Sequence, residues 1–214
     1  GNLSYDALTI GFARRATGYK RHTLIFSDIR RLSRIGKGSN LQIIMAGKAH
    51  RSDIQGKEMI EAAHRYMREL SGQLKAAYLE NYNVDIALKM VSGCDIWLNT
   101  PLQPYEACGT SGMKAALNGV LNFSVLDGWW LEGWIEGVTG WAIGPHPDAN
   151  ISAEERYVKE LEDLYGKLEY IILPRYSKSR GEWIKMMKNS IKLLAPRFNT
   201  HHMLYKYVVS AYNG

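Results

Sequence analysis

The chain has little cysteine, no long apolar run and no leader-like segment. Its 214 residues include only two cysteines, Cys94 and Cys108, which argues against a disulfide framework and for reduced thiols in a cytoplasmic setting. No apolar stretch approaches the roughly 20 residues that span a bilayer, and no signal peptide is visible, so we expect no membrane contact. The chain begins with Gly1, just before its first predicted strand, which suggests a piece cut from a longer protein.

Acidic residues are outnumbered by basic ones, 21 against 27, which gives a formal net charge of +6. A basic chain can bind nucleic acid, but no nucleic-acid motif accompanies this charge, so we expect no such partner and assign part of the excess to phosphate binding. The six histidines have no metal-site spacing, because the adjacent His201 and His202 would point apart on a helix. We therefore expect no metal.

Apolar strand patterns alternate with helical ones along the first two-thirds of the chain. Strands are predicted at 7–13, 41–46, 74–79, 95–98 and 121–125, with a short sixth at 140–143. Helices are predicted over 17–35, from Ile60 to a stop at Gly72, and over 84–91. The continuous apolar strands are typical of parallel sheets that are buried on both faces. The pattern predicts an α/β fold with a doubly wound, mostly parallel, Rossmann-like sheet.

The last third of the sequence is predicted to be helical. Ser152 and Glu155 form a capping box, and we expect the helix that they start to end at Pro174. A second apolar stripe runs from Ile184 to a stop at Pro196, and a final helix begins near Asn199. We expect one domain over residues 1–214, with an α/β sheet core in 1–150 and a helical part in 151–214.

A glycine-rich corner, Glu106-Ala-Cys-Gly-Thr-Ser-Gly-Met-Lys114, joins the strand at 95–98 to a short helix predicted at 113–117. Its glycines let the backbone approach an anion, and a helix start supplies N–H donors. We expect Lys114 on the first helical turn, where the dipole disfavours a cation, so this lysine is a candidate for chemistry. Taken alone, such a corner is often a plain strand–helix junction.

Four cations occur within eight residues directly after the first strand: Arg14, Arg15, Lys20 and Arg21. In open α/β sheets, ligands bind at the carboxyl ends of the strands. A charge run is most often a solvated surface, but the start of a helix disfavours cations, so an anionic ligand accounts better for this segment. Together with the corner at 106–114, the segment suggests a site for two anions.

At these motifs the chain resembles the α-glucan phosphorylases, the family of glycogen, starch and maltodextrin phosphorylases, and most closely the C-terminal domain of their shorter bacterial and archaeal branch. The matching pieces follow the family's order over about two-thirds of the chain: 14–15 with 19–21, 47–49, 80–82, 106–114, 116–119 and 126–128. The resemblance implies the C-terminal half of a two-domain, GT-B type glycosyltransferase. It also implies a missing N-terminal domain of the same enzyme and is compatible with a homo-oligomer.

The resemblance also implies a cofactor. The family carries pyridoxal phosphate as a Schiff base on the lysine matched by Lys114. The positions that match cofactor contacts are Lys114, Thr110, Ser111, Arg14 and Tyr82. Arg14 stands where the family has a lysine, and a guanidinium fork does not replace an ammonium group exactly. Tyr82 is expected against the pyridine ring, although an aromatic residue at a strand end fits a core position equally well.

The reaction implied is phosphorolysis of a terminal α-1,4-glucosyl link of a glucan by orthophosphate, which releases glucose 1-phosphate with retained configuration. Arg15 and Lys20 match the catalytic cations that bind the substrate phosphate, and Lys114 acts through the cofactor. Glu106 matches a carboxylate that hydrogen-bonds a glucose hydroxyl, beside the backbone groups of Cys108 and Gly109. In this family the phosphate of the cofactor is the acid–base partner of the substrate phosphate.

Two other functions stay open. A nucleotide-sugar transferase similar to glycogen or starch synthase shares the fold and the Arg15 and Lys20 pair, but that family lacks a lysine equivalent to Lys114. A non-catalytic glucan-binding or regulatory module is the other alternative, because an active site of this architecture lies between two domains. For the same reason we expect the chain alone to be inactive.

Overall fold

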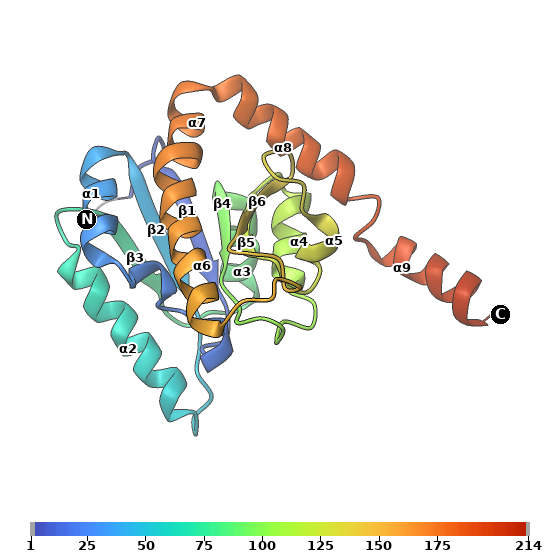
Figure 1. Ribbon diagram of the computed structural model, residues 1–214, viewed down its shortest axis with the longest axis horizontal. Coiled ribbons are helices and arrows are strands. Elements are labelled where there is room, and N and C mark those ends of the chain that lie inside the picture. Colours follow the sequence, from blue (N-terminus) through green and yellow to red (C-terminus); the bar gives the residue numbers. More distant parts are fainter. Residues whose placement is uncertain (1–2, 213–214) are drawn as a thin grey trace.

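The computed structural model describes residues 3–212 and contains a six-stranded parallel sheet of order β3-β2-β1-β4-β5-β6 (Figure 1). The strands are β1 (Leu8–Ala13), β2 (Leu41–Ala46), β3 (Lys75–Leu79), β4 (Ile96–Asn99), β5 (Leu121–Val125) and β6 (Gly140–Ile143). Neighbouring strands pair in parallel throughout, with Leu8 beside Leu41 and Ile10 beside Ile96. The predicted Rossmann-like sheet is confirmed. Its strand order reverses between β1 and β4, the place where folds of this kind bind ligands.

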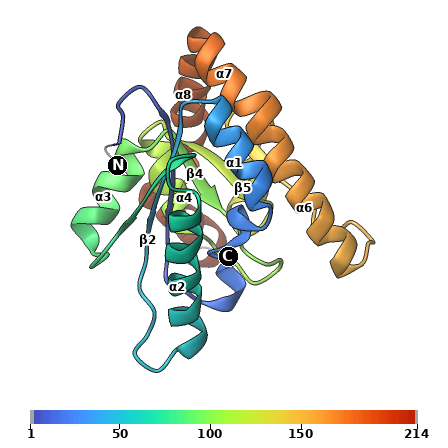
Figure 2. The same cartoon turned by 90° about the vertical axis from the view of Figure 1, so that its left-hand side faces the viewer.

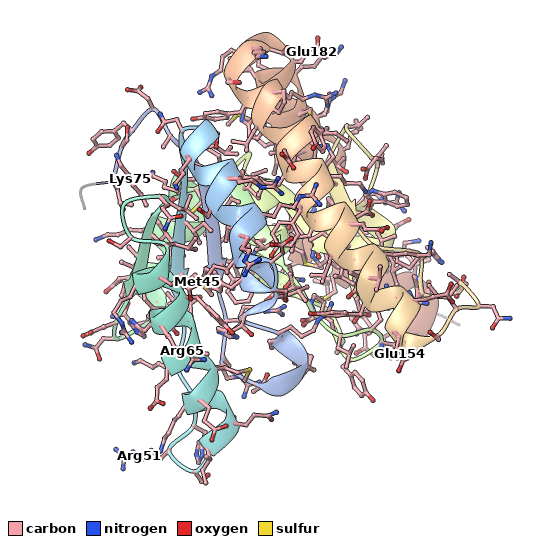
Figure 3. All side chains as sticks on the ribbon, turned by 60° about the vertical axis from the view of Figure 1, so that its left-hand side comes forward. Met45, Arg51, Arg65, Lys75, Glu154 and Glu182 are labelled. Atoms are coloured by element: carbon pink, nitrogen blue, oxygen red, sulfur yellow. The ribbon has the colours of Figure 1, made fainter. Side chains whose placement is uncertain are left out.

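Helices cover both faces of the sheet. α1 (Ile29–Gly38), α2 (Ile54–Glu69) and α6 (Ala153–Lys167) pack on one face, while α3 (Val84–Gly93) and α4 (Thr110–Leu117) pack on the other (Figure 2). Side chains alternate along β1 accordingly: Phe12 joins the larger core, and Ala13 joins a smaller core with Trp97. Met45 is fully buried between the sheet and the first group of helices (Figure 3).

The helix predicted over 17–35 is wrong in its first half. Gly18–Lys20 and Leu24–Phe26 are two separate 3-10 turns, and α1 begins only after Asp28, whose side chain accepts a hydrogen bond from the Arg31 amide at 2.8 Å. The first turn ends because Arg21 takes a left-handed conformation, with φ of 48°. In contrast, α2 begins earlier than predicted, at Ile54, because the Asp53 side chain caps it.

The helical last third has the expected capping box but not the expected end. Ser152 accepts from the Glu155 amide at 3.1 Å and starts α6. Pro174 does not end this helix: α6 continues through a π-helical turn (Leu168–Ile172) into α7 (Leu173–Lys178). Pro174 lies in the first turn of α7, where its missing N–H group costs little.

Two further helices end the described part of the chain. α8 (Arg180–Leu194) packs against α4, and α9 (Thr200–Tyr207) is capped by Asn199, as predicted. α9 extends away from the body of the protein (Figure 1) and contains no buried residue. No helix among residues 3–212 is both long enough and apolar enough to cross a membrane.

Candidate active site at the carboxyl edge of the sheet

The candidate site lies where the two central strands end. Arg14 directly follows β1, and Asn99 is the last residue of the adjacent β4. The Arg14 guanidinium donates a hydrogen bond to the Asn99 carboxamide oxygen, so the two strand ends are joined across the point where the strand order reverses. Asn99, which donates in turn to the Ser124 hydroxyl at 3.2 Å, was not predicted as a site residue.

Three buried charged residues form the centre of the site: Arg14, Lys20 and Glu106, called here the Glu106 cluster. The Lys20 ammonium donates to both carboxylate oxygens of Glu106, at 3.0 and 2.8 Å, and Arg14 donates to one of them. Each of the three residues is less than a tenth exposed. Because charged groups leave water only at a high cost, two cations that share one carboxylate leave a positive charge without a partner.

The electrostatics of the cluster keep the carboxylate ionised. Burial alone would raise the pKa of Glu106, but the hydrogen bond from Lys20 and the positive charge of Arg14 together outweigh burial and lower this pKa. The cluster therefore carries a net charge of about +1 at neutral pH, as a binding site for an anion requires.

The loop after β5 holds Glu106 in place. The Asp127 carboxylate accepts from the Glu106 amide and from the Gly128 amide, both at 2.9 Å, and the Trp129 amide donates to the Cys108 carbonyl at 2.9 Å. Burial raises the pKa of Asp127, and the two amide hydrogen bonds oppose that rise. The Cys108 carbonyl is thus already paired, and burial raises the pKa of the Cys108 thiol.

The corner at 106–114 forms a helix start without a side-chain cap. Gly109 is the N-cap of α4 with φ of 88°, a conformation that glycine adopts without strain. No side chain among residues 3–212 caps the helix, so the first amides of α4, at Thr110 and Ser111, are available to bind an anion. The Ser111 hydroxyl accepts from the Trp97 indole at 3.3 Å.

The position of Lys114 corrects one sequence argument. α4 begins at Thr110, three residues earlier than predicted, because Gly109 allows the chain to turn there. Lys114 therefore lies in the last turn of this helix, where the dipole favours a cation, and not in the first. Lys114 is exposed. The dipole argument for its chemistry is wrong, so its assignment depends on the motif alone.

The structure brings Lys20 together with Arg14, not with Arg15. Successive side chains at the end of a strand point to opposite sides, and here Arg14 is buried while Arg15 is exposed. Tyr82 is half-buried and packs against the smaller core. Burial raises the pKa of Tyr82, and the positive charge of Arg14 opposes this rise.

His22 was not predicted as part of the site, yet its ring contacts the backbone of Arg14. Its Nε2 lies 3.2 Å from the Arg14 carbonyl oxygen, and its ring meets Phe12 edge-on at 4.8 Å. The side chain is only 1% exposed. Burial lowers the pKa of His22 to about 4, although the hydrogen bond to Arg14 opposes the shift. His22 is therefore neutral in the folded chain at neutral pH.

We expect this buried histidine to make the fold sensitive to acid. Between pH 6.5 and 4 the unfolded chain binds a proton at His22 that the folded chain excludes, so stability falls as the pH falls. From pH 7.5 to 5 the loss attributable to His22 is about 2 kcal/mol. Urea unfolding at both pH values, compared with His22→Gln, measures it. An equal loss in the variant would contradict the assignment.

The chain is similar to carbohydrate phosphorylases at the level of sequence. The Phosphorylase family model, described as carbohydrate phosphorylase, matches residues 6–136. The chain is 45% identical to a glycogen phosphorylase of Aquifex aeolicus and 46% identical to a maltodextrin phosphorylase of Thermococcus litoralis, in each case over 99% of its length. It spans only 31% and 25% of the length of these two relatives.

A solved structure supports the fold. Anabaena HepE, crystallised with UDP and glucose, superposes with a TM-score of 0.68 over 96% of this chain and 49% of its own, at 17% sequence identity. At this low identity, the structural similarity is evidence for the fold alone. The family model covers most of the chain, including the segment from Arg14 to Arg21 and the corner at 106–114. The chain belongs to the carbohydrate phosphorylase family.

Proposed function

We propose that the chain is the cofactor-binding C-terminal part of an α-glucan phosphorylase. The enzyme would cleave terminal α-1,4-glucosidic links with orthophosphate and release glucose 1-phosphate. The observation that carries this proposal is the Glu106 cluster, a buried group with excess positive charge beside the uncapped start of α4, at the strand-order reversal of the sheet. The names of the relatives, glycogen phosphorylase and maltodextrin phosphorylase, support the same function.

The residues present fit pyridoxal phosphate. Free helix-start amides at Thr110 and Ser111 and the guanidinium of Arg14 suit a phosphate group, and Lys114 offers an exposed amine on the same short helix. Tyr82 would lie against the ring. When bound, the cofactor would supply a phosphate group as an acid–base partner for the substrate. The residues of this chain would bind and orient that group.

The remaining residues would bind substrate. We assign Lys20 and Arg15 to the substrate phosphate, and Glu106 with the backbone at Cys108 and Gly109 to the sugar. Two phosphates repel each other, and one opposite charge near 4 Å offsets about 4 kcal/mol at an effective dielectric of 20. Several cations are therefore needed in one place, and the structure brings two of them, Arg14 and Lys20, together at Glu106.

An N-terminal domain of the same enzyme would complete the site. α9 and the turn after it expose a set of large apolar side chains without a partner in the described structure: Met203, Leu204, Tyr205, Tyr207, Val208, Val209 and Tyr212. We propose that the missing domain covers this surface and provides the other half of the glucan site. The chain alone would then show no phosphorolysis.

A nucleotide-sugar transferase is the second candidate, because HepE was solved with UDP and glucose. The phosphorylase is favoured since the candidate cofactor lysine, Lys114, lies in a region that the phosphorylase family model covers.

The test is to trap the cofactor on its lysine. After incubation with pyridoxal phosphate, borohydride reduction and peptide mapping, we expect the label on Lys114. Lys114→Arg should remove the label, whereas Lys89→Arg, at another exposed lysine on α3, should not. Labelling that is spread over surface lysines and is unchanged in Lys114→Arg would contradict the proposal.

A further inference from the structure

We propose that Arg21 and Glu160 are positioning residues that fix the Lys20 ammonium group in the site. Arg21 directly follows Lys20, and Glu160 lies on α6, about 140 residues further along the chain. The inference rests on the proposed function, because it concerns the geometry of a cation assigned there to the substrate phosphate.

The backbone at Arg21 indicates a constraint. Arg21 has φ of 48° and ψ of 55°, a left-handed conformation that a side chain with a Cβ atom disfavours. Such a conformation persists only when its surroundings enforce it. At this position it ends the turn Gly18–Lys20, and the preceding residue, Lys20, contacts Glu106.

The Arg21 side chain provides that enforcement. Its Nε donates to the Thr100 carbonyl at 2.9 Å, one terminal nitrogen donates to the Pro101 carbonyl at 2.8 Å, and the other binds the Glu160 carboxylate. The planar guanidinium group of Arg21 thus donates hydrogen bonds to three different acceptors, and a lysine ammonium group could not reproduce this geometry. The guanidinium thus ties the turn that carries Lys20 to the segment that follows β4.

The Glu160 side chain is buried, and Arg21 is its ion-pair partner. Glu160 is 1% exposed, and one of its carboxylate oxygens has no hydrogen-bond partner in the described structure. Room for it exists only because residue 144 is glycine: a Cβ atom there would lie 2.5 Å from the Glu160 Cγ. A buried carboxylate held by a single arginine is costly in itself, so a role in positioning accounts for it better than a role in stability.

Further hydrogen bonds lock the same two segments together. The Thr100 hydroxyl donates to the carbonyls of Lys20 and Arg21, both at 3.2 Å, and the Leu102 amide donates to the Tyr19 carbonyl at 2.7 Å. Lys20 lies on one of these segments, and Glu106 follows shortly after the other. The Arg21–Glu160 pair therefore connects α6 to the contact between Lys20 and Glu106.

The experiment observes Lys20 directly in the full chain. In protein labelled with ¹⁵N-lysine, NMR measures the hydrogen exchange of the Lys20 ammonium, assigned with Lys20→Met, and a calorimetric titration measures inorganic phosphate binding. We expect Arg21→Lys and Glu160→Gln to accelerate this exchange and to weaken phosphate binding by roughly tenfold each, as displacement of a binding group does. Circular dichroism checks that each variant is folded.

A second Arg–Glu pair provides the matched control. Arg31 on α1 and Glu169 after α6 also join the first third of the chain to its helical part, at 3.0 Å, but away from the site. Arg31→Lys and Glu169→Gln should leave the Lys20 exchange within twofold of the unmodified chain. A purely structural role of Arg21 and Glu160 would make the two pairs behave alike.

The outcomes separate the two proposals. If the unmodified chain binds no phosphate, the assignment of Lys20 to a phosphate fails, while the Lys20 exchange still tests the positioning role. An unchanged Lys20 signal in folded Arg21→Lys or Glu160→Gln overturns the inference. If neither variant folds, the unmodified chain labelled with ¹⁵N-arginine decides: Arg21 guanidinium protons that exchange as fast as those of exposed arginines overturn the inference, and protected ones support it.

Discussion

Replacing Glu106 with alanine should lower the free energy of unfolding by about 3–5 kcal/mol, because it leaves two buried cations without their counter-charge. Arg14 and Lys20 are both less than a tenth exposed, and Glu106 is the carboxylate that both of them contact. Urea unfolding at pH 7 measures the loss.

The control for this substitution is Glu169→Ala. Its pair with Arg31 is between a fifth and a third exposed, so solvent screens it, and its loss should cost less than about 1 kcal/mol. A loss of similar size in the two variants would mean that the buried cations of the Glu106 cluster do not depend on the Glu106 carboxylate more than an exposed ion pair does.

Orthophosphate adds a functional criterion to the same experiment. If the cations of the cluster bind phosphate, millimolar orthophosphate should stabilise Glu106→Ala more than the unmodified chain, because it replaces the missing anion. Sulfate at equal ionic strength shows whether any dianion suffices, and chloride controls for screening. A variant that phosphate does not stabilise would contradict the assignment of Lys20 to a phosphate.

Most of the sheet could be predicted from sequence because the strands from β1 to β6, apart from the partly exposed edge strand β3, are buried on both faces. Runs such as the six buried residues of β1 contain little besides apolar side chains, and glycine or a cap interrupts the chain between them. The segment at 17–35 could not be predicted in the same way. Its apolar residues Leu24 and Ile25 fit a helical stripe with Ile29 and Leu32, but in the structure they lie in a separate 3-10 turn before the helix begins.

The candidate site was predicted residue by residue but not as a set of contacts. The motifs named Arg14, Lys20 and Glu106, yet nothing in their spacing indicates that one carboxylate pairs with both cations. The partners that hold the site come from other strand ends and from α6: Asn99, Asp127 and Glu160. A polar residue at the end of a buried strand, or within two residues after it, is a usable signal for the first two. No sequence signal identifies Glu160, because it is one of many charged residues on an amphipathic helix.

The second large effect is expected at Gly128, where an added methyl group has no room. Gly128 has φ of 55°, and a Cβ atom there would lie 2.4 Å from the Cys108 carbonyl oxygen and 2.9 Å from the Glu106 carbonyl oxygen. Both neighbours are backbone atoms, so no flexible side chain can move aside. Gly128→Ala therefore combines backbone strain with overpacking and should cost about 3 kcal/mol or more.

Gly72→Ala separates the two causes. Gly72 has φ of 78°, but nothing lies within 4 Å of a Cβ atom there, so its cost is backbone strain alone, about 1–2 kcal/mol. The excess loss in Gly128→Ala then measures how rigidly the loop after β5 holds the corner at 106–114. Because the same shift would displace Glu106 and the start of α4, Gly128→Ala should also reduce borohydride labelling of Lys114, and Gly72→Ala should not. Equal losses of stability in both variants, with labelling intact, would show that this corner moves freely and that Asp127 does not position it.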